Sequence, residues 1–198
     1  ALDGKTEFVY HTQLLPHEED LEIDEAKARA MFAESFNLES EIEIISRNTW
    51  RAGFALVAEK FSQGNIFIAG DAAHLFTPTG GLGYNTAVED AVNLGWKLAA
   101  VLKGWGGAQL LDTYHVERHK NGLRNTSLAR GFADSLGDFK VTPELEDDTE
   151  AGMAARRIAG EYLDRHVRAE FNIPGITFGY RYDGSAVVVS DGTNSPPD

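Results

Sequence analysis

The most regular hydrophobic pattern of the chain lies in residues 84–104. Apolar residues recur there at steps of three and four, and the polar residues lie four apart on the other side. The apolar set is Ala87, Ala91, Leu94, Leu98 and Val101, and the polar set is Glu89, Asn93 and Lys97. This spacing predicts an amphipathic helix whose apolar side faces a core, with Gly104 as its end.

The residues before this helix predict a strand and a turn. Residues 65–69 form a short apolar run that ends at Gly70 and Asp71, which is typical of a strand with a carboxylate at its carboxyl end. Residues 77–83 then contain one proline and three glycines, so their backbone can adopt positive φ and approach a flat ligand closely. The stretch 65–104 is therefore predicted to be a strand, a glycine-rich turn and a helix.

Other segments carry weaker signals. Asp24 is a predicted N-cap for a helix over residues 25–36, and further helices are predicted over about 110–134 and 150–171. Strands are predicted at 41–47 and 53–59. A hairpin with strands at 176–182 and 185–189 is predicted around Asp183 and Gly184.

Composition narrows the class of partner. The chain has 198 residues, 42% of them hydrophobic, and a formal net charge of −13 without a basic stripe, which argues against binding to nucleic acid or to an anionic membrane. Without cysteine there is no disulfide framework. No apolar run approaches the roughly 20 residues of a membrane span. We expect a cytoplasmic protein that binds small molecules.

The junction between strand and helix indicates a ligand chemistry. A helix that starts after a glycine turn presents unpaired N–H groups and the positive end of its dipole, which stabilise an anion. Asp71, at the end of the preceding strand, instead requires a hydroxyl donor. A reduced flavin supplies both, because its ribityl chain carries hydroxyls and its ring carries charge near N1 and the C2 oxygen.

The same residues resemble a known family. The run GDAAHLFTPTGGLGYNTAVEDAVNLGWKLAAVLKG, followed by LLDTYHVERHK, resembles the second flavin-binding motif of FAD-dependent aromatic hydroxylases of the para-hydroxybenzoate hydroxylase and phenol hydroxylase type. The likeness is close over about residues 65–120. That family opens with a GxGxxG unit for the ADP half of FAD and has a middle DG motif, and this sequence has neither. We therefore interpret the chain as the carboxyl-proximal part of such an enzyme.

The resemblance implies a fold and a domain organisation. The fold class is α/β with some α+β character, a partial Rossmann-like FAD/NAD(P)-binding domain with strands of the substrate-binding sheet. Residues 1–60 would belong to the substrate-binding sheet region, and residues 61–140 would hold the second FAD motif and long helices. Residues 141–198 would form a helix, a hairpin and a linker toward a further domain.

The resemblance also implies a reaction. NADPH or NADH would reduce FAD, oxygen would add to it as a C4a-hydroperoxide, and a small phenolic or other aromatic substrate would be hydroxylated. Two alternatives remain open. The chain could be a catalytically inert fragment that acts as an interaction module, or part of a related flavin enzyme such as a halogenase.

Site residues follow position by position from the family motif. Asp71 would accept a hydrogen bond from a ribityl hydroxyl, and Pro78 would lie near the substrate and the oxygen site. The other implied cofactor contacts are Gly70, Gly80, Gly81, Leu82, Gly83, Tyr84 and Asn85. Tyr84 departs from the Met, Leu or Ala that is commoner in the family. The alternative for this turn is an ordinary glycine-rich helix entry, and for Asp71 it is a cap of its own turn.

Several further residues have two readings each. Trp50 is the candidate for the substrate pocket, or it packs at a strand edge. His74 matches the GDAAH run and would either brace the turn or take part directly in catalysis. Tyr114 and Arg118 match the family's YxxER signature, which implies that they anchor their helix against the cofactor helix. His115 and His119 have the i, i+4 spacing of metal ligands, but no third ligand is evident, so no metal site is predicted.

The predicted strand at 65–69 also bears on assembly. In the family this strand has neighbours from an amino-terminal part, so the chain alone would expose apolar surface and strand edges. We therefore expect self-association, as a homodimer or a swapped assembly.

Overall fold

The computed structural model describes the chain except residues 1, 13, 15–21, 38–40, 50–53 and 195–198. It has mixed helix and sheet content, as predicted, and divides into two compact units, Ala1–Trp50 and Arg51–Asp198. Each unit is considered by itself. The division into domains at residues 60 and 140 stays a prediction.

Among its described residues, the first unit has one helix, α1 (Glu25–Phe36). The Asp24 side chain accepts a hydrogen bond from the Lys27 N–H, so the predicted helix and its N-cap are confirmed. The helix ends at Asn37, whose φ of 48° is left-handed. Aromatic rings from the N-terminal segment pack against this helix, in a cluster of Phe8, Tyr10, Phe32 and Phe36.

The second unit begins with four two-residue strands in two antiparallel pairs. β1 (Leu56–Val57) pairs with β4 (His74–Leu75), and β2 (Ser62–Gln63) pairs with β3 (Ile66–Phe67). The predicted strands at 53–59 and 65–69 are therefore present only as the two-residue strands β1 and β3. Residue 53 lies outside the described residues. A short 3-10 turn, η1 (Gly70–Ala72), separates β3 from β4.

Three other strand predictions are wrong. Residues 41–47 form no strand, and residues 185–189 form none either. Within 176–182 the chain instead completes a short helix, α5 (Pro174–Thr177), which proline begins well because its fixed φ suits the first helical turn. A strand requires a neighbour for its backbone hydrogen bonds, and in the described part of the chain these segments pair with none.

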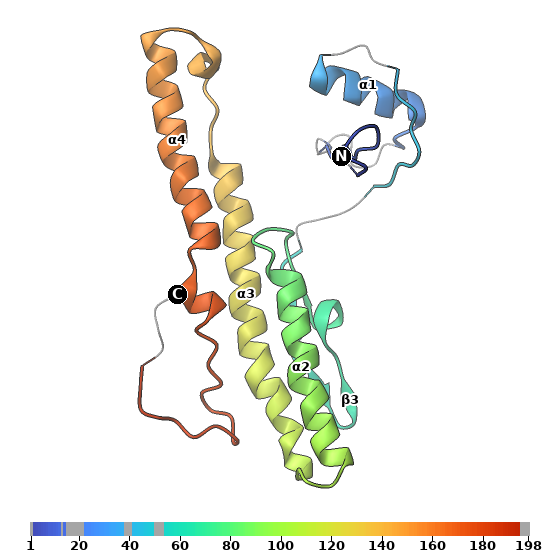
Figure 1. The fold of residues 1–198 in the computed structure, drawn as a ribbon, viewed down its shortest axis with the longest axis vertical. Helices are drawn as coiled ribbons and strands as arrows, with labels where there is room; N and C mark the ends of the chain where they lie inside the picture. The colour runs from blue at the N-terminus through green and yellow to red at the C-terminus, as the bar shows by residue number, and fades with distance from the viewer. Residues whose placement is uncertain (1, 13, 15–21, 38–40, 50–53, 195–198) are drawn as a thin grey trace. The chain divides into compact units, whose positions relative to one another are not determined.

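Helices make up most of the second unit. These are α2 (Leu82–Leu102), η2 (Ala108–Leu110), α3 (Asp112–Asp138), η3 (Pro143–Glu146) and α4 (Glu150–Phe171). The three long helices confirm the predictions, with boundaries shifted by a few residues in α2 and α3. Figure 1 shows α2 and α3 side by side along much of their lengths, with α4 beside the other end of α3. None of the described helices combines the length and apolar content that crossing a bilayer requires.

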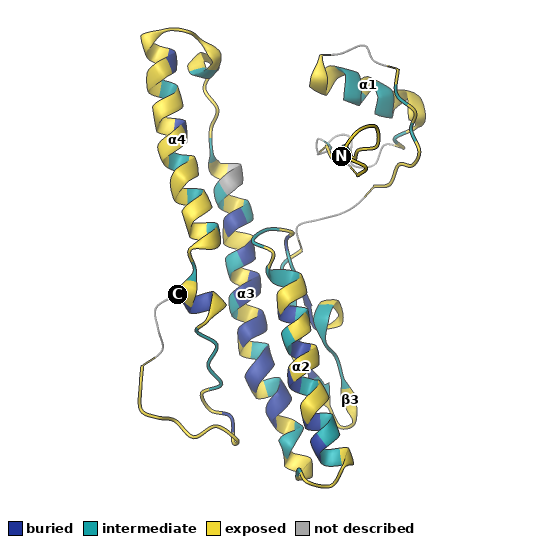
Figure 2. Cartoon of the chain, viewed as in Figure 1, coloured by how far each residue is buried: buried dark blue, intermediate teal, exposed yellow. Residues whose placement is uncertain are grey.

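The core lies between the small strands and α3. Phe61 and Tyr114 are fully buried, and Ala73 is nearly so. Figure 2 shows that the buried residues concentrate on α3 and on the side of α2 that faces it, whereas most of α4 is exposed. Helix α3 is therefore the element against which the predicted cofactor segment packs.

The predicted orientation of α2 is wrong for its polar side, although Leu94 packs against the core as predicted. Asn93 and Lys97, expected on the solvent side, are buried, and Ala91, expected in the core, is exposed. The buried set is Thr86, Asp90, Asn93, Lys97 and Ala100. We call Thr86, Asp90, Asn93 and Lys97, with Glu117 and Arg118 of α3, the polar seam. Hydrophobic periodicity gave the wrong side because the polar groups satisfy one another across the helix pair.

Candidate functional site

Asp71, the predicted strand-end carboxylate, lies in the 3-10 turn η1 and not directly after β3. Gly70 has a φ of 58°, and its N–H donates to Asp90 Oδ2 at 3.1 Å, which sets the backbone immediately before Asp71. Asp71 itself is exposed, and no side-chain hydrogen bond engages it within the described residues. A β-carbon at Gly70 would lie 3.3 Å from the Ala87 β-carbon, so α2 packs closely behind this turn.

The glycine-rich turn is held from one side and open on another. Gly80 and Gly81 both have positive φ, 66° and 64°. A β-carbon on Gly80 would lie 3.3 Å from the Phe132 ring, whereas one on Gly81 would meet nothing within 4 Å. The Thr79 hydroxyl donates to the Ala129 carbonyl at 2.5 Å, which ties the turn to α3. Pro78 is exposed at the start of the turn.

The first turn of α2 lacks a side-chain cap. Gly81 is the N-cap residue and has no side chain to satisfy the first helical N–H groups. Asn85 donates its side-chain amide to the Gly81 carbonyl at 2.7 Å, so this side chain does not accept from the N–H groups of the first turn through that bond. Leu82 and Gly83 are half-buried, and Tyr84 is 79% exposed. The phenol of Tyr84 thus points away from the core.

One buried carboxylate connects these parts. Asp90 Oδ2 lies 2.6 Å from His74 Nε2, and its Oδ1 accepts from Arg118 Nε at 2.8 Å. The side chains of all three residues have no exposed surface. Arg118 also donates to Glu89 at 3.0 Å and to the Thr86 carbonyl at 3.3 Å. Asp90 therefore joins β4, α2, α3 and, through the Gly70 amide, the backbone beside Asp71.

The electrostatics of this cluster favour its charged form. Burial would raise the pKa of Asp90, but hydrogen bonds from His74, Arg118 and the Gly70 amide outweigh it and hold that pKa below its usual value. Burial would lower the pKa of Arg118, yet Asp90 raises it. Because an ionised Asp90 can only accept, His74 Nε2 carries the hydrogen of their bond. His74 thus braces β4 against α2, as predicted from the GDAAH run.

A second buried pair lies further along the polar seam. Lys97 Nζ and Asn93 Nδ2 donate to Glu117 Oε2 at 2.6 and 2.7 Å, and Ser185 Oγ donates to Oε1 at 2.6 Å. Burial would raise the pKa of Glu117, but these donors lower it. For Lys97, burial lowers the pKa despite the bond to Glu117. This cluster also fastens the C-terminal segment, through Ser185, to the helix pair.

Tyr114 and Arg118 of the YxxER signature play different parts, and its third fixed residue, Glu117, belongs to the second buried pair. Arg118 makes the predicted contact with the cofactor helix, through Asp90 and Glu89. Tyr114 instead donates its hydroxyl to the Ile68 carbonyl at 2.8 Å, so it anchors the segment that runs from β3 to Asp71. Burial and the nearby Asp90 carboxylate raise the pKa of Tyr114, which keeps its hydroxyl a donor.

The predicted histidine pair forms no metal site within the described part of the chain. The rings of His115 and His119 lie 4.8 Å apart, but no group of three metal-binding side chains occurs among the described residues. The main-chain N–H of Phe61 donates to His115 Nδ1 at 3.2 Å, which gives that histidine a structural partner. Trp50, the candidate for the substrate pocket, lies outside the described residues.

Sequence reasoning missed Asp90. In the sequence, Asp90 is one more acidic residue in a helix that also carries Glu89, Asn93 and Lys97, and a charged residue of a helix is normally assigned to solvent. Asp90 links two features, the exposed carboxylate of Asp71 and the start of α2, whose amides have no side-chain cap. These groups fit a ligand that offers hydroxyls at one point and delocalised negative charge at another, as a flavin with its ribityl chain does.

Comparison with known proteins agrees with this geometry. A model of the family described as "FAD binding domain" matches residues 4–129. Rifampicin monooxygenase of Streptomyces venezuelae is 58% identical over 127 residues, which are 64% of this chain and 25% of that protein. Dialkyldecalin synthase of Streptomyces rugosporus is 42% identical over 130 residues, 66% of this chain and 27% of that protein.

A solved structure shows the same likeness in three dimensions. The flavin-dependent monooxygenase PieE, in complex with FAD and substrate, superposes with a TM-score of 0.71 at 32% identity. The match covers 93% of this chain and 34% of PieE. This chain thus spans about a quarter of the two curated relatives and about a third of that structure.

Proposed function

Because this chain belongs to the family of FAD binding domains, we propose that it forms the flavin-facing part of an FAD-dependent monooxygenase that hydroxylates an aromatic substrate. One observation supports the proposal: Asp90 of α2, the helix with the uncapped start, also accepts a hydrogen bond from the Gly70 amide next to the exposed Asp71 carboxylate. Both groups would serve the same ligand.

Each part of the assembly has a separate task in this proposal. Asp71 accepts a hydrogen bond from a ribityl hydroxyl, and the backbone around Gly70 presents it. The amides from Leu82 to Asn85 face the flavin N1 and C2 oxygen, where the positive end of α2 stabilises negative charge. The two glycines at the turn let the backbone approach the ring, and Pro78 borders the substrate.

FAD supplies the redox chemistry, with NADPH or NADH as electron donor and O2 as oxidant. The chain itself orients the cofactor and holds the amide dipoles of α2 in position before negative charge develops on the flavin. Preorganised donors of this kind are typically worth about 3–4 kcal/mol in catalysis. The substrate would be a small aromatic compound.

A titration followed by visible absorbance tests the binding step. We expect FAD to bind the purified chain with a perturbed spectrum, and Asp71→Ala to weaken binding by about 1–3 kcal/mol, as for loss of a charged hydrogen bond. Asp148→Ala, at an exposed aspartate of the same unit, is the matched control and should bind as the parent does. Equal FAD affinity of Asp71→Ala and the parent would refute the role of Asp71.

A relative named as a synthase motivates a second candidate, in which the same fold serves a reaction other than hydroxylation. Product analysis with aromatic substrates separates the two. Hydroxylation consumes NAD(P)H and O2 with incorporation of one oxygen atom, whereas a rearrangement or cyclisation leaves both unconsumed.

A further inference from the structure

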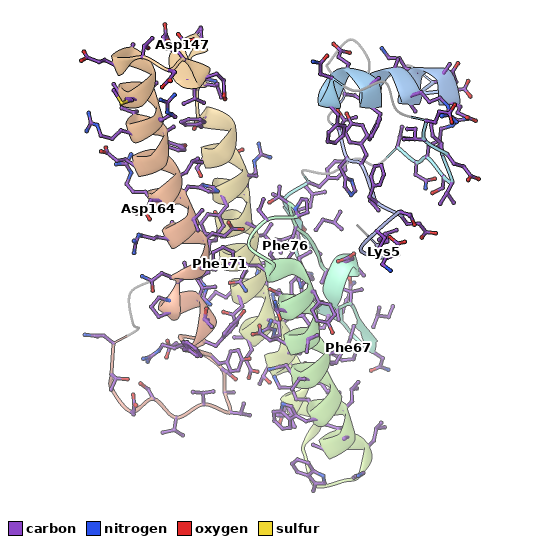
Figure 3. The ribbon with its side chains drawn as sticks, turned by 45° about the horizontal axis from the view of Figure 1, so that its top comes forward. Lys5, Phe67, Phe76, Asp147, Asp164 and Phe171 are labelled. Carbon is purple, nitrogen blue, oxygen red and sulfur yellow. The ribbon has the colours of Figure 1, made fainter. Side chains whose placement is uncertain are left out.

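The glycine-rich turn has a partner that lies far away in the sequence. The N–H of Gly80 donates to Glu170 Oε1 at 3.0 Å, across 90 residues. Glu170 is half-buried in the last turn of α4, next to Phe171, which Figure 3 labels at that end of the helix. A carboxylate therefore already contacts the turn that the proposed function assigns to the flavin.

The position of Glu170 is unfavourable within its own helix. A carboxylate in the last turn of a helix faces the negative end of the dipole. Gly80, however, lies two residues before Leu82, where α2 begins and its dipole is positive. The electrostatic benefit of Glu170 thus comes from the cofactor turn rather than from α4.

Other contacts from α3 and α4 support the same turn. Phe132 of α3 lies against Gly80, and its ring meets the His166 ring edge-on at 6.3 Å. His166 Nδ1 lies 2.7 Å from Ser135 Oγ, which links α4 to α3. Together with the Thr79 bond to α3, these contacts hold the end of α4 beside the glycine-rich turn.

We propose that Glu170 is a positioning residue of the cofactor turn and that its charge lowers the electron affinity of bound flavin. The inference rests on the proposed function. Its hydrogen bond holds Gly80 in the left-handed conformation that the turn requires. Its negative charge opposes the negative charge that reduction places on the flavin, which the amides of α2 stabilise. The balance between the Glu170 charge and the α2 amides sets the reduction potential of the flavin, and this effect requires no contact between Glu170 and the ring.

Two variants separate the hydrogen bond from the charge. Glu170→Gln keeps an oxygen acceptor for the Gly80 amide but removes the charge, and Glu170→Ala removes both. Glu161→Gln, at an exposed glutamate of the same helix, is the matched control. The measurements are FAD affinity by absorbance, flavin reduction potential against a reference dye, and hydrogen exchange of the Gly80 amide.

We expect Glu170→Gln to retain FAD and to favour reduced over oxidised flavin by about tenfold, which is ~30 mV for a two-electron couple. Glu170→Ala should show a similar shift, weaker FAD binding and faster exchange at Gly80. Glu161→Gln should match the parent in every measurement.

The outcomes are distinguishable. If the parent binds FAD and Glu170→Gln leaves the potential unchanged, the tuning role is refuted while the proposed function stands. If Gly80 exchanges equally in Glu170→Ala and the parent, the positioning role is refuted. If the parent binds no FAD, the proposed function fails and flavin tuning with it, and the Gly80 exchange rates still decide the positioning role.

Discussion

Helix α2 has two faces whose compositions are the reverse of the usual arrangement. The face toward α3 is the polar seam, with Asp90 and Lys97 completely buried. The opposite side carries a row of exposed apolar residues at steps of four, Tyr84, Val88, Val92 and Trp96, which we call the apolar stripe. Trp96 also stacks on Trp105, with ring centroids 6.5 Å apart.

The comparison shows that polar side chains of this helix pair are buried where hydrogen-bond and ion-pair partners meet them. Each carboxylate of the seam accepts at least three hydrogen bonds, and each carboxylate faces a cation. Buried charges of this kind contribute little net stability, but removing one partner strands the other. The apolar stripe has the opposite character, because its side chains are exposed and carry no charge that a partner must balance. Four experiments would break or sharpen this contrast.

The largest effect is expected at Asp90. Asp90→Ala leaves the buried Arg118 and His74 without their shared acceptor and frees the Gly70 amide. We therefore expect the free energy of unfolding to fall by about 3–5 kcal/mol. Urea denaturation measures the change. Glu89→Ala, the half-exposed partner of the same arginine, should cost no more than about 1 kcal/mol. Equal losses in the two variants would contradict the central place of Asp90.

The second pair should respond asymmetrically. Lys97→Met leaves Glu117 with its bonds from Asn93 and Ser185, whereas Glu117→Met strands the Lys97 ammonium. We expect a loss of about 1–3 kcal/mol for Lys97→Met and about 3–5 kcal/mol for Glu117→Met. Thermal or urea unfolding of both variants checks the order, and the reverse order would refute the assignment of Glu117 as the hub.

Acid should weaken the seam progressively. The pKa values of Asp90 and Glu117 lie below the ordinary 3.8 and 4.5, so the folded state binds protons less readily than the unfolded chain. Their stabilisation is complete above those ordinary values and is lost as pH falls through the folded values, by up to about 1.4 kcal/mol per pH unit for each group. Urea midpoints between pH 6 and pH 3 measure this slope, which should be shallower in Glu117→Gln.

The smallest effect on stability is expected on the apolar stripe. Val88→Ser with Val92→Ser should change the free energy of unfolding by no more than about 0.5 kcal/mol per site. The same change should reduce the self-association that we expect of this chain, measured by sedimentation velocity. Val116→Ser, at an exposed valine of α3, is the control. A parent chain that stays monomeric at high concentration would contradict the expectation.

Local signals predicted the helices well. Asp24 caps α1, as predicted, and the glycine-rich turn precedes α2. These signals act over three or four residues, so they survive in any tertiary context. The strands failed for the opposite reason, since a segment such as residues 41–47 becomes a strand only beside a partner.

The motif residues were predicted more fully than their supports. The exposed Asp71 and the uncapped start of α2 lie in a stretch that the sequence singles out. Asp90 and Glu170 were not predicted, because a carboxylate in a helix is normally solvated. Nothing local distinguishes Glu170 from the exposed Glu161 nine residues earlier on the same helix.

The sequence by itself determined which stretches form the long helices, which turn precedes α2 and to which family the stretch around Asp71 is similar. Capping, glycine conformation and residue order are local properties that need no information about neighbours in space. Only the tertiary structure decided which side of α2 is buried and which carboxylates hold the cofactor turn. Those outcomes depend on groups that meet across α2, α3 and α4, where a buried charge is stable only beside its partner.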